Sequence, residues 1–188
     1  MEKPQQSQRD SGTEVITLGG GCFWCTEAVF DRVRGITDVE SGYANGHVPH
    51  PSYEQVCEGT TGHAEVLKLV FDPAQIGLDL LLEIFFGTHD PTTPNRQGND
   101  VGTQYRSAIY TTSEAQLQVA RDFVDMLNQR LLFGVPVVTE VQPLDNYWPA
   151  EAYHQDYFAR NPHQGYCAYV VGPKVQKFLQ TFAQYAKR

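Results

Sequence analysis

The sequence lacks the features of several common classes of protein. Lysine and arginine are outnumbered by aspartate and glutamate, 14 to 22, which leaves a formal net charge of −8. A nucleic-acid groove would need a basic stripe that displaces counterions from phosphate, so we expect no nucleic-acid partner. No run of about eighteen apolar residues occurs, so no membrane span is expected either.

The first 13 residues also lack the apolar stretch of a secretory signal. We interpret residues 1–13 as a polar, disordered N-terminal arm and expect the protein in the cytoplasm. Cysteine is scarce, with four residues that we do not expect to form a disulfide framework in a cytosolic chain of this length: Cys22, Cys25, Cys57 and Cys167. Redox chemistry or metal binding is the better expectation for them.

No internal repeat or low-complexity tract divides the rest of the chain. Its length is enough for one hydrophobic core and too short for two comfortable ones. We therefore expect a single domain over residues 14–188. Nothing in the sequence suggests more than a monomer.

Apolar periodicity and helix-end signals predict an alternation of strands and helices. Strands are expected at residues 14–18, 36–43, 63–71, 106–111 and 137–141. Helices are expected at residues 22–33, 78–86, 113–132, 151–160 and 174–187, with a short one after the capping-box spacing of Ser52 and Gln55. The order strand, helix, strand, strand, helix, strand is that of the split βαβ motif. We predict an α+β two-layer sandwich with a ferredoxin-like core, an extra helix and strand, and an irregular C-terminal segment.

Cys22 follows three glycines and opens a predicted helix. Unpaired amides and the partial positive charge at a helix N-terminus favour a thiolate, which is the form that attacks. A small buried thiol without a role is the alternative, because free cysteines often fill cores. The strand, the glycines and the helix start together favour a nucleophile.

Glu65 is placed by strand alternation on the same face as Leu67, Leu69 and Phe71. A carboxyl in register with an apolar face is either buried or at a cleft edge, and desolvation raises its pKa toward a neutral form at pH 7. Such a group can act as an acid in catalysis. A strand-end glutamate that reaches solvent is an equally good interpretation of this strand alone.

The segment from residue 88 to residue 104 is a long polar loop inside a compact domain, and such loops are usually functional. It contains Asp100, and Tyr105 follows it; turn formation is the alternative role for these positions. Tyr53, Phe23 and Trp24 either pack in the core or form a wall for a substrate alkyl group.

Several motifs together resemble the A-type peptide methionine sulfoxide reductases, the family that acts on the S-epimer of the sulfoxide. They occur in order as GCFW at 21–24, GYANG at 42–46, PSYEQVC at 51–57, TGHAE at 61–65, HDPTT at 89–93, NDVGTQYRS at 99–107 and GYC at 165–167. A further match is YHQ at 153–155. The resemblance covers nearly the whole chain from residue 14 to residue 167.

The resemblance implies a role for each matching residue. Cys22 would attack the sulfoxide sulfur, and Glu65 would protonate the sulfoxide oxygen. The remaining residues would bind substrate: Tyr53 and Tyr105 as hydrogen-bond donors to the oxygen, Asp100 in fixing the substrate, and Phe23 and Trp24 as the pocket for the S-methyl group. Substrates would be methionine sulfoxide, free or in peptides and proteins, without a metal or organic cofactor.

The resemblance also implies how the enzyme is recycled. Cys22 would become a sulfenic acid, condense with a second thiol, and be released as a thiol by thioredoxin or a similar dithiol. Cys167 matches the family's resolving position and lies near Pro162 and Gly165, on a segment expected to move. Cys25 occupies a position where many relatives have a small residue, and we regard it as a secondary resolving thiol.

Two other hypotheses use the same cysteines. A thioredoxin-like dithiol–disulfide oxidoreductase would exchange disulfides directly through Cys22-Phe23-Trp24-Cys25. A structural zinc module would use these two thiols with other cysteines or histidines, although no second ligand pair is well spaced. No role is assigned to Cys57.

Overall fold

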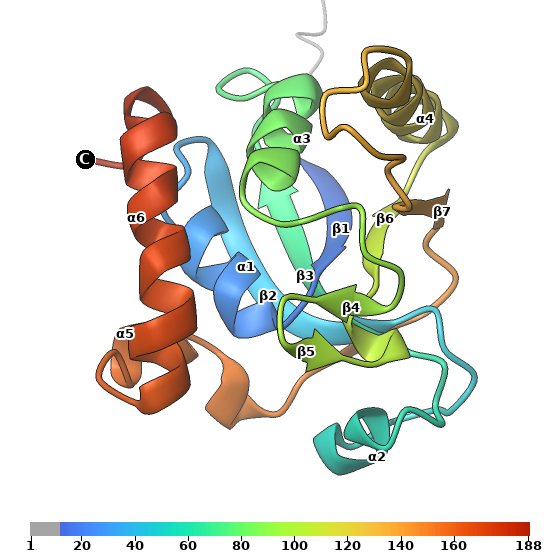
Figure 1. Ribbon diagram of the computed structural model, residues 1–188, viewed down its shortest axis with the longest axis vertical. Helices are drawn as coiled ribbons and strands as arrows, with labels where there is room; N and C mark the ends of the chain where they lie inside the picture. The colour runs from blue at the N-terminus through green and yellow to red at the C-terminus, as the bar shows by residue number, and fades with distance from the viewer. Residues whose placement is uncertain (1–11) are drawn as a thin grey trace, which may run out of the picture.

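A computed structural model describes residues 12–188 (Figure 1). The predicted disordered arm over residues 1–13 lies outside the described residues, apart from Gly12 and Thr13, which are exposed and have no regular structure. None of the helices in the described part of the chain is long and apolar enough to cross a membrane.

A six-stranded sheet forms one layer, in the order β7-β6-β1-β3-β2-β8. Its strands are β1 (Glu14–Gly20), β2 (Ile36–Ala44), β3 (Ala64–Phe71), β6 (Ser107–Thr111), β7 (Glu140–Pro143) and β8 (Tyr147–Pro149). The four inner strands pair antiparallel, and β7 is parallel to β6. This inner order is that of the split βαβ motif, so the predicted fold class is confirmed.

Helices form the second layer and supply the other half of the core. They are α1 (Phe23–Phe30), α3 (Leu78–Gly87), α4 (Glu114–Gln129) and α6 (Gly172–Thr181). Figure 1 shows α1 and α3 lying across the sheet, with α6 beside α1. The main apolar cluster joins all four helices to the sheet through buried residues such as Ile16, Leu69, Phe85, Leu127 and Phe178.

A short helix, α2 (Tyr53–Cys57), begins with Tyr53, which is half-buried. The predicted capping box is present, because the Ser52 hydroxyl accepts from the Gln55 N–H and the Gln55 side chain accepts from the Ser52 N–H. Glu151 fixes the same helix start from a distant segment. One of its carboxylate oxygens accepts from the Tyr53 N–H at 3.1 Å and the other from the Tyr43 hydroxyl at 3.0 Å.

The polar segment from residue 88 to residue 104 is more ordered than a loop. It contains a small hairpin, β4 (Arg96–Gln97) with β5 (Asp100–Val101), followed by a 3₁₀ turn at Thr103–Tyr105. The Gln97 side chain closes the segment on itself, because its amide accepts from the Asp90 N–H and donates to the Asp90 carbonyl. The same side chain packs against Gly21, directly before Cys22.

The C-terminal part departs from the sequence prediction. Strand β7 begins at Glu140 rather than at residue 137, and β8 lies in a stretch that was expected to be irregular. The helix expected at residues 151–160 is interrupted at Asp156, whose φ of 55° is left-handed, so only α5 (Tyr157–Arg160) remains, after a 3₁₀ turn at Ala152–His154. The last helix begins earlier than expected. A π-helical turn at Cys167–Val171 leads directly into α6, which ends at Thr181.

Candidate active site

The backbone around Cys22 places its thiol at the entrance of a helix. Strand β1 ends at Gly20, the chain turns at Gly21 with a φ of 92°, and Cys22 is the N-cap residue of α1. A Cβ atom on Gly21 would lie 2.5 Å from the Gln97 Cγ, so this turn requires glycine. The Cys22 side chain is only 9% exposed.

Burial reverses the electrostatic prediction for Cys22. Desolvation raises the pKa of the Cys22 thiol, and the hydrogen bond to Cys25 and the negative charge of Glu65 act in the same direction. The predicted thiolate at the helix start is therefore wrong for the resting protein, because these effects outweigh the Trp24 N–H, which lowers the pKa. The hydrogen bond with Cys22 instead lowers the pKa of Cys25 to about 7, against its own burial.

Glu65 is buried beside the same helix start, as strand alternation predicts. It is 1% exposed, and its Oε1 accepts from the Phe23 N–H at 3.4 Å. Burial raises the pKa of its carboxyl to about 8, with smaller contributions from the charges of Asp100 and Cys25. The alternative of a solvent-reaching glutamate is wrong. The carboxyl is mostly protonated at pH 7.

Two phenols from different elements lie within range of the charge of this carboxyl. Tyr53 comes from α2, and Tyr105 comes from the 3₁₀ turn after β5. Burial is the largest cause that raises the pKa of each hydroxyl, and the charge of Glu65 raises both further. The neighbouring Cys57 thiol also raises the pKa of Tyr53. Both hydroxyls therefore remain protonated donors next to Glu65.

Asp100 is connected to the thiols through a tyrosine that sequence reasoning did not single out. Its Oδ2 accepts a 2.6 Å hydrogen bond from the Tyr166 hydroxyl, and that hydroxyl lies 3.6 Å from the Cys25 Sγ. Burial raises the pKa of Tyr166, and the thiols raise it further. The only signal for this residue was its place before Cys167 in the GYC motif.

An aromatic wall forms around Trp24. Its ring stacks on Tyr157 with centroids 3.8 Å apart, and its Nε1–H donates to the His154 Nδ1 at 3.0 Å. The Phe23 ring lies 5.0 Å from His154 and is 1% exposed. His154 and Tyr157 were missed from the sequence, where only the YHQ motif pointed to this segment.

Three of the four thiols share one apolar cluster. Cys22, Cys25 and Cys167 pack there with Ala28, Val171 and Val175. Cys167 is fully buried at the start of the π-helical turn, so the expected position on a moving loop is wrong for this conformation. Burial raises its pKa. All four cysteines are free, and Cys57 is exposed at the end of α2.

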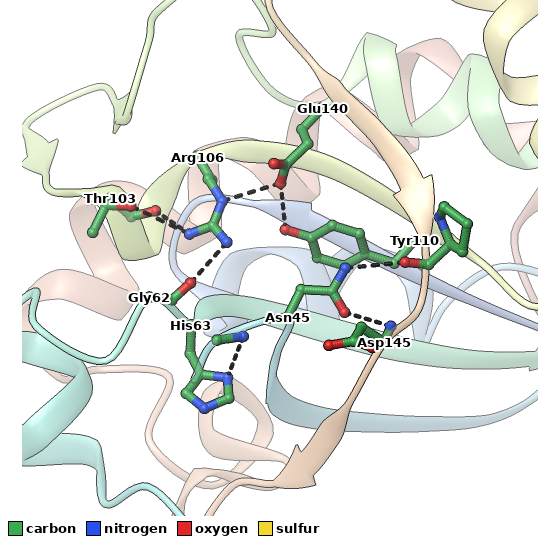
Figure 2. A network of polar contacts seen from close by, with 10 residues as sticks. Asn45, Gly62, His63, Thr103, Arg106, Tyr110, Glu140 and Asp145 are labelled. Carbon is green, nitrogen blue, oxygen red and sulfur yellow. Dashed lines mark hydrogen bonds and ion pairs between the residues drawn. The ribbon is translucent and has the colours of Figure 1, made fainter. Parts of the chain in front are cut away.

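A polar network supports the segments that carry Glu65 and Tyr105 (Figure 2). Arg106 donates to the carbonyls of Gly62 and Thr103, each at 2.9 Å, and forms an ion pair with Glu140 at 3.2 Å. Tyr110 donates to the same Glu140 oxygen at 2.6 Å. The turn before β3 is thereby tied to the turn that carries Tyr105.

Within residues 12–188, no group of three or more histidine, cysteine, aspartate or glutamate side chains is arranged to hold a metal ion. Thiols packed together beside a buried, protonated carboxyl and phenol donors instead suit redox chemistry at sulfur. The α+β fold and this site define a thiol-dependent oxidoreductase.

Comparison with known proteins identifies which one. The profile of the peptide methionine sulfoxide reductase family matches residues 14–186. Curated relatives named peptide methionine sulfoxide reductase MsrA include one from Trichodesmium erythraeum, 53% identical over 90% of this chain and 96% of the relative. Another, from Deinococcus radiodurans, is 50% identical over 95% of this chain and 86% of the relative. The chain belongs to the peptide methionine sulfoxide reductase family.

Solved structures agree with this assignment. Methionine sulfoxide reductase A of Corynebacterium diphtheriae matches with a TM-score of 0.79 and 40% identity, over 86% of this chain and 80% of that one. Reduced Mxr1 from Saccharomyces cerevisiae matches with a TM-score of 0.77 and 38% identity, over 84% and 91%. Mxr1 in complex with Trx2 also matches, with a TM-score of 0.54, 27% identity, and coverage of 81% and 90%. The family assignment replaces the thioredoxin-like and zinc-module hypotheses.

Proposed function

We propose that this chain reduces the S-epimer of methionine sulfoxide, with Cys22 as the nucleophile and Glu65 as the general acid. One observation carries the proposal: a fully buried carboxyl with a pKa of about 8 lies at the same helix start as the Cys22 thiol. A carboxyl that holds its proton at neutral pH can deliver it to an oxygen that gains negative charge.

The chemistry balances without a metal or organic cofactor. The Cys22 sulfur attacks the sulfoxide sulfur while Glu65 protonates the oxygen, and the proton lost from Cys22 restores Glu65. The oxygen is transferred to Cys22, which becomes a sulfenic acid, and methionine leaves as the sulfide. The substrate sulfur gains two electrons, and Cys22 loses two. Once Glu65 is protonated, its charge no longer opposes formation of the Cys22 thiolate.

The other site residues position the substrate in this proposal. Tyr53 and Tyr105 keep their protons beside Glu65 and donate hydrogen bonds to the sulfoxide oxygen. Asp100, held by Tyr166, helps to fix the substrate. The Trp24 ring, together with Phe23, forms the apolar wall for the S-methyl group, and the Tyr157 stack and the His154 hydrogen bond fix its orientation.

Two thiols compete to resolve the sulfenic acid. Cys25 has the lower pKa, about 7, and contacts Cys22 directly, which favours a fast reaction. Cys167 packs in the same cluster, and its disulfide with Cys22 is the one we propose as productive, with Cys25 as the secondary route. Either condensation releases water. A thioredoxin-type dithiol then reduces the disulfide, and Mxr1 in complex with Trx2 is a structural relative that supports this partner.

The proposal is tested with the two separated epimers of N-acetyl methionine sulfoxide and dithiothreitol as reductant. We expect reduction of the S-epimer alone, and loss of activity in Cys22→Ser. Comparable rates on both epimers, or full activity in Cys22→Ser, would contradict the proposal.

A further inference from the structure

A cavity of about 570 Å³ lies beside the candidate active site and outside the thiol cluster. It is formed where the start of α2 meets β8 and the segment after it. Its chemically distinctive lining residues are His50, Glu54, Trp148, Glu151 and Tyr153. None of these residues is used in the proposed chemistry at sulfur. Figure 1 places α2 at the end of the molecule opposite to α3 and α4.

The cavity shares a wall with the sulfoxide site. Glu54 follows Tyr53 in α2, and Tyr153 precedes His154. The His154 ring lies 4.5 Å from the Tyr53 ring and 4.0 Å from the Tyr153 ring. Successive Cα atoms are only about 3.8 Å apart, so residues close in sequence to an oxidised methionine bound at Cys22 are the ones that would reach across this shared wall.

The lining has the chemistry of a site for an organic cation. Two carboxylates, those of Glu54 and Glu151, line the cavity. Burial raises the pKa of the Tyr153 hydroxyl in the same lining, and the charges of these two carboxylates raise it further. Glu151 is held in place by the Tyr43 hydroxyl and the Tyr53 N–H. The Trp148 and Tyr153 rings add aromatic faces, and the His50 ring packs on Trp148 with centroids 4.1 Å apart. No lysine or arginine is among the lining residues.

We propose that this cavity binds the lysine or arginine side chain of a residue that flanks the oxidised methionine in a peptide substrate. Carboxylates and aromatic faces both attract such a side chain, and the chain's net charge of −8 favours its approach. The inference rests on the proposed function and adds a preference for sequence context to it.

The test compares short peptides that contain the S-sulfoxide and differ only in their flanking residues, lysine in one and glutamine in the other. We expect kcat/KM for the lysine peptide to be roughly 3- to 10-fold higher. The difference should lie in KM, because the contact is equally strong in the ground state and the transition state. Glu54→Gln should bring the ratio close to one, and Trp148→Leu should reduce it. The matched control Glu58→Gln, an exposed carboxylate outside the cavity, should keep it.

Two outcomes would overturn the inference. One is a ratio near one in the wild-type protein. The other is a ratio that survives Glu54→Gln but disappears at roughly 0.5 M salt, which would assign the preference to the overall field of the protein. Both leave the proposed function intact, because that is tested separately on N-acetyl methionine sulfoxide, which has no flanking residue.

Discussion

Replacing Glu65 with glutamine separates proton donation from every other role of this position. Glutamine has nearly the same shape and its amide oxygen can still accept from the Phe23 N–H, which lies 3.4 Å from Glu65 Oε1. What it cannot do is supply the proton. General acid catalysis is typically worth on the order of 10²–10⁴-fold, so we expect Glu65→Gln to slow the reductive step by that factor.

The rate of the reductive step should also depend on pH through the Glu65 carboxyl. Because the pKa of Glu65 is about 8, the acid form is lost as the pH rises through 8, and the wild-type rate of the reductive step should fall there. The residual rate of Glu65→Gln should lack that alkaline limb. The assay is single-turnover formation of methionine from the S-epimer, without reductant, between pH 6 and pH 10 or so.

The Glu65 carboxyl should also make the stability of the wild type depend on pH in a way that Glu65→Gln lacks. A carboxyl whose folded-state pKa is raised from 4.5 to about 8 stabilises the fold below pH 4.5, and this contribution is lost as the pH rises to 8. Relative to Glu65→Gln, the wild type should lose about 1.4 kcal/mol per pH unit across that window, on the order of 5 kcal/mol in total. Urea unfolding at several pH values measures the difference.

Glu27 provides the matched control. This second buried carboxyl lies in α1, whereas Glu65 lies in β3. Burial raises the pKa of Glu27 to about 7, and its Oε2 accepts a hydrogen bond from the Ser41 hydroxyl. Glu27→Gln should therefore alter the pH dependence of stability and leave the alkaline limb of the rate in place. A reductive step in Glu65→Gln within threefold or so of the wild type, or with the same limb near pH 8, would refute the assignment of the acid.

Three further predictions follow from the thiol cluster and its supports. Cys167→Ser should keep single-turnover reduction but lose most thioredoxin-dependent turnover. Cys25→Ser should keep both activities. The opposite pattern in steady-state assays would make Cys25 the resolving thiol. Arg106→Gln should cost about 1–3 kcal/mol in urea unfolding and lower kcat, because two carbonyls lose a charged donor; unchanged values would show that the network does not position Tyr105. Gly21→Ala should reduce dithiothreitol-dependent activity far more than Gly98→Ala. Both positions have a positive φ, but only at Gly21 would the added Cβ meet another side chain. Equal effects of the two substitutions would contradict the role of that contact.

The positions of Cys22, Glu65 and Tyr53 in the fold could be predicted from the sequence, because each depends on residues close to it along the chain. A strand followed by three glycines and a helix placed Cys22, strand alternation placed Glu65, and capping-box spacing placed Tyr53 on a short helix. The split βαβ order followed from the succession of elements and gave the correct inner sheet. Each of these inferences needs only neighbours along the chain.

What the sequence did not show depends on contacts between distant segments. The Gln97 contact with Gly21 and the link from Asp100 through Tyr166 to Cys25 have no local signature. The pKa of Cys22 was predicted in the wrong direction for the same reason. The helix-start effect is local, but the burial that outweighs it comes in part from a cluster that includes Cys167 and its helix.

The number of residues in the π-helical turn at Cys167–Val171 sets the direction in which the Cys167 thiol points. Such turns hold one residue more than the α-helix and often occur at functional positions. Deleting that extra residue would restore α-helical winding and rotate everything before it by about 100° around the helix axis. The Cys167 thiol would then turn away from Cys22 and Cys25 while Val175 kept its place. The number of residues between Cys167 and α6 therefore indicates which relatives can share this recycling geometry. The presence of a cysteine that matches Cys167 is not enough by itself.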